Sequence, residues 1–105
     1  PAGHLDGNET VMQAGIREAQ EEVGVALAEQ DTTFSSVMHR IEDDERVDFF
    51  VQVHQWAGEP FNAEPDKCDD LRWVEINSLP ANIIPYVKQA LDNHLNGIPF
   101  AEYKL

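Results

Sequence analysis

Three glutamates lie close together near the start of the chain, and they are the residues with which this sequence could do chemistry. Glu18, Glu21 and Glu22 would share one side of a helix. Like charges at these spacings repel by roughly 0.2–0.5 kcal/mol per pair, and a hard divalent cation would reverse that cost. Because the carboxylates have no Cys or His cluster beside them, Mg²⁺ or Mn²⁺ is favoured over Zn²⁺. The alternative is a solvated acidic face, which is the commoner role of such a charge run.

A single helix is expected to position these glutamates. Thr10 and Gln13 have the T-x-x-Q spacing of a capping box at its start. Gly24 is the residue type that most often follows the end of a helix. Apolar residues recur at helical spacing on roughly the opposite side and would form a buried stripe: Met12, Ile16, Ala19 and Val23. The pattern therefore predicts an amphipathic helix with one buried face and one anionic face.

The glutamates also belong to a longer pattern that spans residues 3–25. It reads G-x5-E-x7-R-E-U-x-E-E-x-G-U, where U is a bulky aliphatic or similar apolar residue. Nine constrained positions are filled by Gly3, Glu9, Arg17, Glu18, Ala19, Glu21, Glu22, Gly24 and Val25. This segment resembles the box of the Nudix family, with Ala19 smaller than the residue usually found at its position. The match is far more specific than a lone glycine motif, so the metal-binding interpretation outweighs the solvated face.

The resemblance implies a set of metal ligands. Glu21 and Glu22 match positions that bind the metal in the family, and Glu18 matches one that binds metal or acts as the general base. The backbone carbonyl just before the first glycine of the box often ligates too, and here it belongs to Ala2. Many members carry Gly at that place, but a carbonyl ligand survives the change. The expected cofactor is Mg²⁺, with Mn²⁺ as a substitute.

The remaining box residues are expected to hold the site together. Glu9 lies in the loop before the helix, where its carboxylate could pair with the Arg17 guanidinium and hold the loop against the helix. Gly3 has no side chain, which would let backbone approach the metal. In the family, these residues have that structural part. We therefore group Arg17 and Glu9 with Glu18 in the catalytic machinery, and Gly3 with the substrate contacts.

Two further segments bear on the site. Residues 56–64 resemble the W-x-G-E-P-x-x-x-E segment of the MutT-type branch, whose last glutamate is a further metal ligand; an ordinary exposed acid is the alternative for Glu64. Leu79-Pro80-Ala81-Asn82 resembles the region where that branch reads a guanine edge through Asn, which offers both a donor and an acceptor. Asn82 is also a good N-cap for the helix that follows, and this structural role is the favoured one.

The rest of the chain predicts a small α+β domain. Phe34 to Arg40 and Arg46 to Trp56 read as two strands of a hairpin around an acidic turn, and alternation in the second suits a sheet with one face well buried. Leu71 to Val74 reads as a short strand. A helix follows in which apolar residues repeat until Gly97 stops it: Ile84, Val87, Leu91 and Leu95. The resemblance implies a Nudix-type α/β/α sandwich with a mixed sheet.

Length and composition bound the possible functions. The 105 residues, 42% of them hydrophobic, suit one domain over 1–105. The Nudix fold places sheet strands ahead of its box, so we expect this domain to be incomplete at its N-terminus. A formal net charge of −13 argues against binding duplex nucleic acid. No stretch approaches the ~20 apolar residues of a membrane helix, and no signal peptide is visible, so a cytoplasmic location is expected.

The resemblance implies an enzyme that hydrolyses a nucleoside diphosphate linked to another group. Divalent cations would offset the charge that develops as water attacks a bridge phosphorus, while a carboxylate takes the proton. We assign Glu18 as that base, although Glu64 could exchange roles with it. The MutT-like segment favours a Mg²⁺-dependent pyrophosphohydrolase that converts a nucleoside triphosphate, for example an oxidised purine nucleotide, into the monophosphate and pyrophosphate.

Two other functions compete with this one. The first is a diphosphatase acting on ADP-ribose or a nucleotide sugar. The second is a sensor domain that binds nucleotide without hydrolysing it; such members commonly have a damaged box, whereas this one keeps all three of its helix glutamates. A homodimer is expected by analogy with the family only.

Overall fold

A computed structural model describes residues 7–64 and 79–105, which divide into two compact units. The first is formed by residues 7–33 and 51–64, and the second by residues 34–50 and 79–105. The strand predicted over Leu71 to Val74 lies outside the described residues. Within the described ranges, neither helix is long and apolar enough to cross a membrane.

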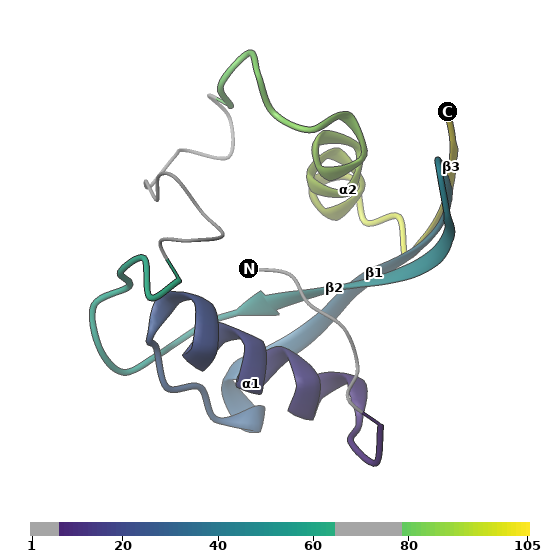
Figure 1. Cartoon of the computed structure of the whole chain (residues 1–105). Helices are drawn as coiled ribbons and strands as arrows, with labels where there is room; N and C mark the ends of the chain where they lie inside the picture. The colour runs from purple at the N-terminus through teal and green to yellow at the C-terminus, as the bar shows by residue number, and fades with distance from the viewer. Residues whose placement is uncertain (1–6, 65–78) are drawn as a thin grey trace. The chain divides into compact units, whose positions relative to one another are not determined.

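The first unit contains the predicted glutamate helix, α1, over Val11–Val23 (Figure 1). The Thr10 hydroxyl accepts a hydrogen bond from the Gln13 backbone N–H at 3.1 Å, and the Gln13 amide oxygen accepts one from the Thr10 N–H at 2.9 Å, so the capping box is confirmed. Gly24 follows the helix with φ +72°, a left-handed conformation that glycine adopts without strain. Ala19 and Val23 are buried as the stripe predicts, and they form a small core with Val25.

The strands form a three-stranded mixed sheet in the order β2-β1-β3. After a short 3-10 helix, η1 (Glu29–Asp31), β1 runs over Thr32–Ile41 and β2 over Glu45–Val53, which gives the predicted hairpin. The third strand, β3, covers Phe100–Lys104 and lies parallel to β1. Its register pairs Val37 with Phe100 and Ile41 with Lys104. The sheet and helices confirm the α+β class, although the sequence analysis missed β3.

The second strand is shorter and less buried than predicted. It ends at Val53 rather than Trp56, because the chain then turns and makes an isolated bridge between Ala57 and Ala26. The expectation of a well-buried face is also wrong, since Val47 is 57% exposed and Phe49 47%. In the second unit, a helix packs on the opposite face of the sheet, where the side chains of Arg40 and its partners lie.

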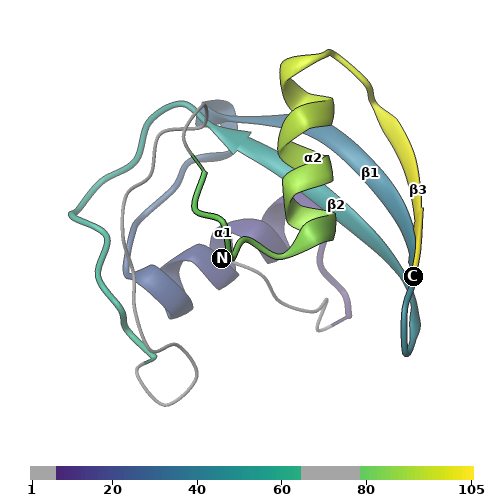
Figure 2. The same cartoon turned by 90° about the horizontal axis from the view of Figure 1, so that it is seen from above.

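The second helix, α2, spans Pro85–Leu95 and packs on that face of the sheet (Figure 2). The Arg40 guanidinium stacks 4.0 Å from the ring centroid of Tyr86, and Tyr86 meets Tyr103 edge to face at 6.4 Å. Arg40 also donates to Asp48 at 2.7 Å and to Glu42 at 2.9 Å. These hydrogen bonds raise the pKa of Arg40 further above its ordinary value. The guanidinium therefore ties β1, β2 and α2 together.

One prediction about this helix is wrong. The N-cap is Ile84 and not Asn82, because Pro85 occupies the first helical position and holds the residue before it in an extended conformation. The apolar repeat is buried only in part, since Val87 and Leu91 are half-buried while Ile84 and Leu95 are more than half exposed. The buried residues of the helix are Ala90 and Asn93.

Candidate active site

The acidic face of α1 presents its carboxylates to different degrees. The side chain of Glu18 is 16% exposed and that of Glu21 51% exposed, while Glu22 is half-buried. The helix spacing puts the three on one side, opposite the buried Ala19 and Val23. The sequence therefore placed these side chains correctly relative to one another.

Arg17 is the centre of an ion-pair network within the box. Its guanidinium donates to both oxygens of Glu9, at 2.9 Å through Nη2 and 3.3 Å through Nε. The Nη1 atom donates to Glu18 at 2.8 Å and to Glu21 at 3.2 Å. The fork to Glu9 holds residues before the helix against the helix itself, as the sequence analysis expected. The same cation neutralises part of the repulsion between Glu18 and Glu21.

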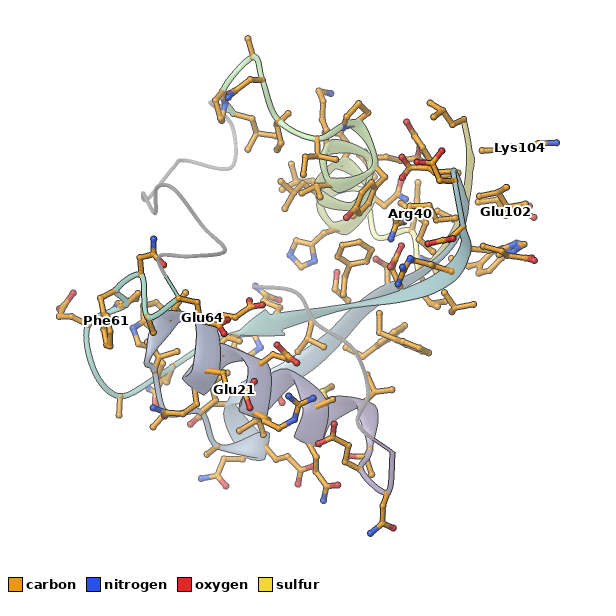
Figure 3. All side chains as sticks on the ribbon, viewed as in Figure 1. Glu21, Arg40, Phe61, Glu64, Glu102 and Lys104 are labelled. Atoms are coloured by element: carbon orange, nitrogen blue, oxygen red, sulfur yellow. The ribbon has the colours of Figure 1, made fainter. Side chains whose placement is uncertain are left out.

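A loop from the far end of β2 docks on the last turn of α1. The Phe61 N–H donates to the carbonyl of Val23 at 2.9 Å, and the Ala63 N–H donates to that of Glu22 at 3.0 Å. The final carbonyls of a helix lack partners within it, so the loop satisfies groups that α1 leaves open. Glu64 follows Ala63 directly and therefore lies beside the turns that carry Glu22 and Glu21 (Figure 3).

Asn62 shapes the end of this loop. Its side-chain oxygen accepts a hydrogen bond from the Glu64 N–H at 3.2 Å, which makes a local turn. Glu64 is half-buried where the sequence offered an ordinary exposed acid as the alternative. The docking and the turn together bring a fourth carboxylate, 42 positions along the chain from Glu22, to the glutamate helix.

These carboxylates fit a hard divalent cation by their chemistry. In the part of the chain that the structure describes, no three acidic, His or Cys side chains converge into a preformed metal cage. Mg²⁺ does not need one, since it usually keeps several waters and is held by one or two carboxylates together with substrate phosphates. The donors are all oxygens, and Glu21 is exposed enough to turn from Arg17 toward an incoming ion.

The roles of three predicted site residues stay predictions. Ala2 and Gly3 lie outside the described residues, so their roles stay predictions. Asn82 is an exposed turn residue of the second unit, and its proposed contact with a base likewise stays a prediction.

Sequence reasoning overlooked Phe61, which lies against Gly24 at the end of α1. A Cβ added to Gly24 would overlap Cε1 of the Phe61 ring and lie 2.8 Å from its Cζ. Phe61 occupies an unconstrained place in the W-x-G-E-P-x-x-x-E segment, so the motif alone gave it no role. The available signal was an aromatic residue within a loop, paired with a helix-ending glycine.

Known proteins that are similar to this chain show which family it belongs to. The family model of the NUDIX domain matches residues 1–93. The chain is 31% identical over 85 residues to the 8-oxo-dGTP diphosphatase of Escherichia coli (strain K12), covering 81% of this chain and 63% of that protein. It is 30% identical over 95 residues to the 8-oxo-dGTP diphosphatase of Haemophilus influenzae, covering 90% and 67%.

A phosphatase and a protein of known structure are also similar to this chain. The phosphatase NudJ of Escherichia coli (strain K12) is 31% identical over 74 residues, which cover 70% of this chain and 33% of that protein. The crystal structure of a MutT NUDIX hydrolase from Burkholderia pseudomallei superimposes with a TM-score of 0.78 at 31% identity, over 86% of this chain and 70% of that one. This likeness confirms the predicted Nudix fold, and the chain belongs to the Nudix family, as a protein of the MutT type.

Proposed function

We propose that this protein is a Mg²⁺-dependent pyrophosphohydrolase that cleaves a nucleoside triphosphate into the monophosphate and pyrophosphate. The observation that carries the proposal is the docking of the Glu64 loop on α1 through the carbonyls of Val23 and Glu22. It adds a carboxylate to a helix face that already presents three. A surface acid on a solvated helix would not require such an arrangement.

The residues divide into ligands and a base. Glu21, Glu22 and Glu64 would hold the cation, which supplies positive charge to offset the charge developing on the phosphate oxygens. Glu18 would accept a proton from the attacking water as the new bond to phosphorus forms and the bridging P–O bond breaks, releasing pyrophosphate. Arg17 contacts Glu18 at 2.8 Å and Glu9 at 2.9 Å, and so it would keep the base in place during this step.

The names of two relatives support one substrate class. Two of them are named as 8-oxo-dGTP diphosphatases, which supports an oxidised purine nucleoside triphosphate as substrate here. The contact of Asn82 with a base edge stays a prediction of the family resemblance, through an amide that offers both a donor and an acceptor. A homodimer and a cytoplasmic location accompany this proposal as predictions.

A substrate panel tests the proposal. The full chain is incubated with oxidised and ordinary purine triphosphates, ADP-ribose and a nucleotide sugar, with Mg²⁺ or EDTA, and pyrophosphate and phosphate are measured separately. We expect pyrophosphate from triphosphates only when Mg²⁺ is present, and a fall of about 10²-fold or more in Glu22→Gln. Monophosphate from ADP-ribose with untouched triphosphates would refute it, as would phosphate without pyrophosphate.

A third result would identify a sensor. Tight nucleotide binding with no metal-dependent turnover, unchanged by Glu22→Gln, would mean that the box binds but does not catalyse. Glu102→Gln is the matched control, since it removes a carboxylate from β3, in the other unit.

A further inference from the structure

The side chain of Phe61 makes a close contact although the residue is largely exposed. Phe61 is 57% exposed, yet its ring lies so close to Gly24 that no side chain could be added to Gly24 without moving the ring. The backbone of Gly24 is left-handed (φ +72°), and the turn there directs the chain away from the end of α1. Because glycine has no side chain, the ring can approach its Cα. The ring therefore rests on backbone.

This contact lies between the backbone hydrogen bonds that dock the loop. Ala57 and Ala26 exchange N–H···O bonds of 2.9 and 3.0 Å on one side of it, and Phe61 N–H and Ala63 N–H bond to α1 on the other. A hydrogen bond adds only modestly to stability, because water competes for both of its partners in the unfolded chain. A catalytic carboxylate needs firmer positioning, since a displacement of about 1 Å can lower the rate of an enzyme about 10²-fold.

We propose that Phe61 is a positioning residue for Glu64: its ring, seated on Gly24, fixes the loop against α1 so that the Glu64 carboxylate reaches the cation held by Glu21 and Glu22. The inference rests on the proposed function. Phe61 touches neither metal nor nucleotide in this role and acts only through Glu64, three residues on. Phe61 and Glu64 should therefore be energetically coupled for metal binding.

A double-mutant cycle on Mn²⁺ affinity tests the coupling without turnover. Free Mn²⁺ is followed by electron paramagnetic resonance in the full chain and in Phe61→Ala, Glu64→Gln and the double variant. Loss of a group that supports a metal ligand typically weakens binding about 10–100-fold, so we expect about a 10-fold loss in each single variant. The double variant should lose little more than either, because the ring has no effect once its carboxylate is gone.

Two further variants separate positioning from general stability. Phe61→Tyr keeps the ring on Gly24 and should retain the Mn²⁺ affinity. Phe100→Ala is the matched control, because Phe100 is 55% exposed on β3, in the other unit, and its loss should leave the affinity unchanged. Losses that multiply in the double variant, or an unchanged affinity in Phe61→Ala, would overturn the inference.

The same experiment distinguishes the failure of this inference from that of the proposed function. A chain that hydrolyses triphosphates with Mg²⁺ but gives multiplicative losses retains its function, and only the role of Phe61 is wrong. A raised KM in Phe61→Ala with unaltered Mn²⁺ affinity would also overturn it, since the ring would then contact the nucleotide. A chain that binds Mn²⁺ with coupled losses but hydrolyses nothing would keep the role of Phe61 and lose the proposed reaction. A chain that binds no Mn²⁺ would refute both.

Discussion

Replacing Arg17 by Gln removes the cation at the centre of the box and leaves its carboxylates behind. The guanidinium makes three hydrogen bonds to Glu9 and Glu18, of 2.8, 2.9 and 3.3 Å, and a fourth to Glu21. The Arg17 side chain is 25% exposed and those of Glu9 and Glu18 are 16% exposed, so solvent screens these bonds in part. Glu21 is half exposed, and its bond adds little.

The expected loss of stability follows from these numbers. A hydrogen bond to a charged group is worth about 1.5–3 kcal/mol, and we reduce the three to about 2–3 kcal/mol in total for partial exposure and for the single guanidinium that they share. For a domain of about 100 residues this lowers Tm by about 10–20 °C. Arg17→Lys keeps the charge but loses the paired hydrogen bonds to Glu9. Its Tm should therefore lie between that of the unaltered chain and that of Arg17→Gln.

A divalent cation should offset part of this loss. The substitution takes away the cation that Glu9, Glu18 and Glu21 share, so Mg²⁺ should bind more tightly and its stabilisation by linkage should increase. Thermal unfolding is followed by circular dichroism with EDTA and with millimolar Mg²⁺. The Tm rise on adding Mg²⁺ should be larger in Arg17→Gln than in the unaltered chain, even though Tm in EDTA is lower.

Arg46→Gln is the matched control for this prediction. Arg46 pairs with Asp44 at 3.0 Å near the hairpin tip, where the side chains are 40% and 68% exposed. A surface pair of this kind contributes about 0–1 kcal/mol. The Tm of Arg46→Gln should respond to Mg²⁺ as that of the unaltered chain does. If Arg17→Gln behaves like Arg46→Gln in EDTA, or if its Mg²⁺ response is no larger, then the electrostatic account of the box is wrong.

Three other substitutions test separate parts of the fold by thermal or denaturant unfolding. Gly24→Ala should lower the free energy of unfolding more than Gly97→Ala does. Both glycines are left-handed, at φ +72° and +67°, so an added side chain costs about 1–2 kcal/mol in strain at either position, but only at Gly24 does it also meet the Phe61 ring. Equal losses would contradict this. Asn93→Leu should raise stability by about 1 kcal/mol, since the buried Asn93 Nδ2 has no hydrogen-bond partner among residues 7–64 and 79–105. A fall in Tm would show that the amide is needed. Arg40→Met should lower stability by about 2–4 kcal/mol through lost hydrogen bonds and ring stacking. Because the hydrogen bonds to Asp48 and Glu42 raise the pKa of Arg40, its contribution is fully present below its unfolded pKa and is lost only as pH rises through the still higher folded pKa. Both values lie well above the assay range, so the deficit should be equal at about pH 7 and about pH 9; a deficit that shrinks over that range would refute this assignment.

The sequence by itself determined the helix that carries the chemistry. Its start follows from Thr10 and Gln13, its end from Gly24, and the common side of its glutamates from the helical repeat. These are local relations, fixed by backbone geometry over three or four residues. Local reasoning failed at Asn82 only because a stronger local signal, Pro85 at the first helical position, sets the start of α2 one residue after Ile84.

Only the tertiary structure decided the contacts between residues that lie far apart in the sequence. The docking of the 57–63 loop on α1, the parallel pairing of β3 with β1 and the face that α2 buries all join residues far apart in the chain. A motif could predict that Glu64 is a ligand, but not that the ring of Phe61 lies against Gly24. Such contacts form because open helix carbonyls and apolar surface find partners when the chain folds, and no local spacing encodes which partners those are.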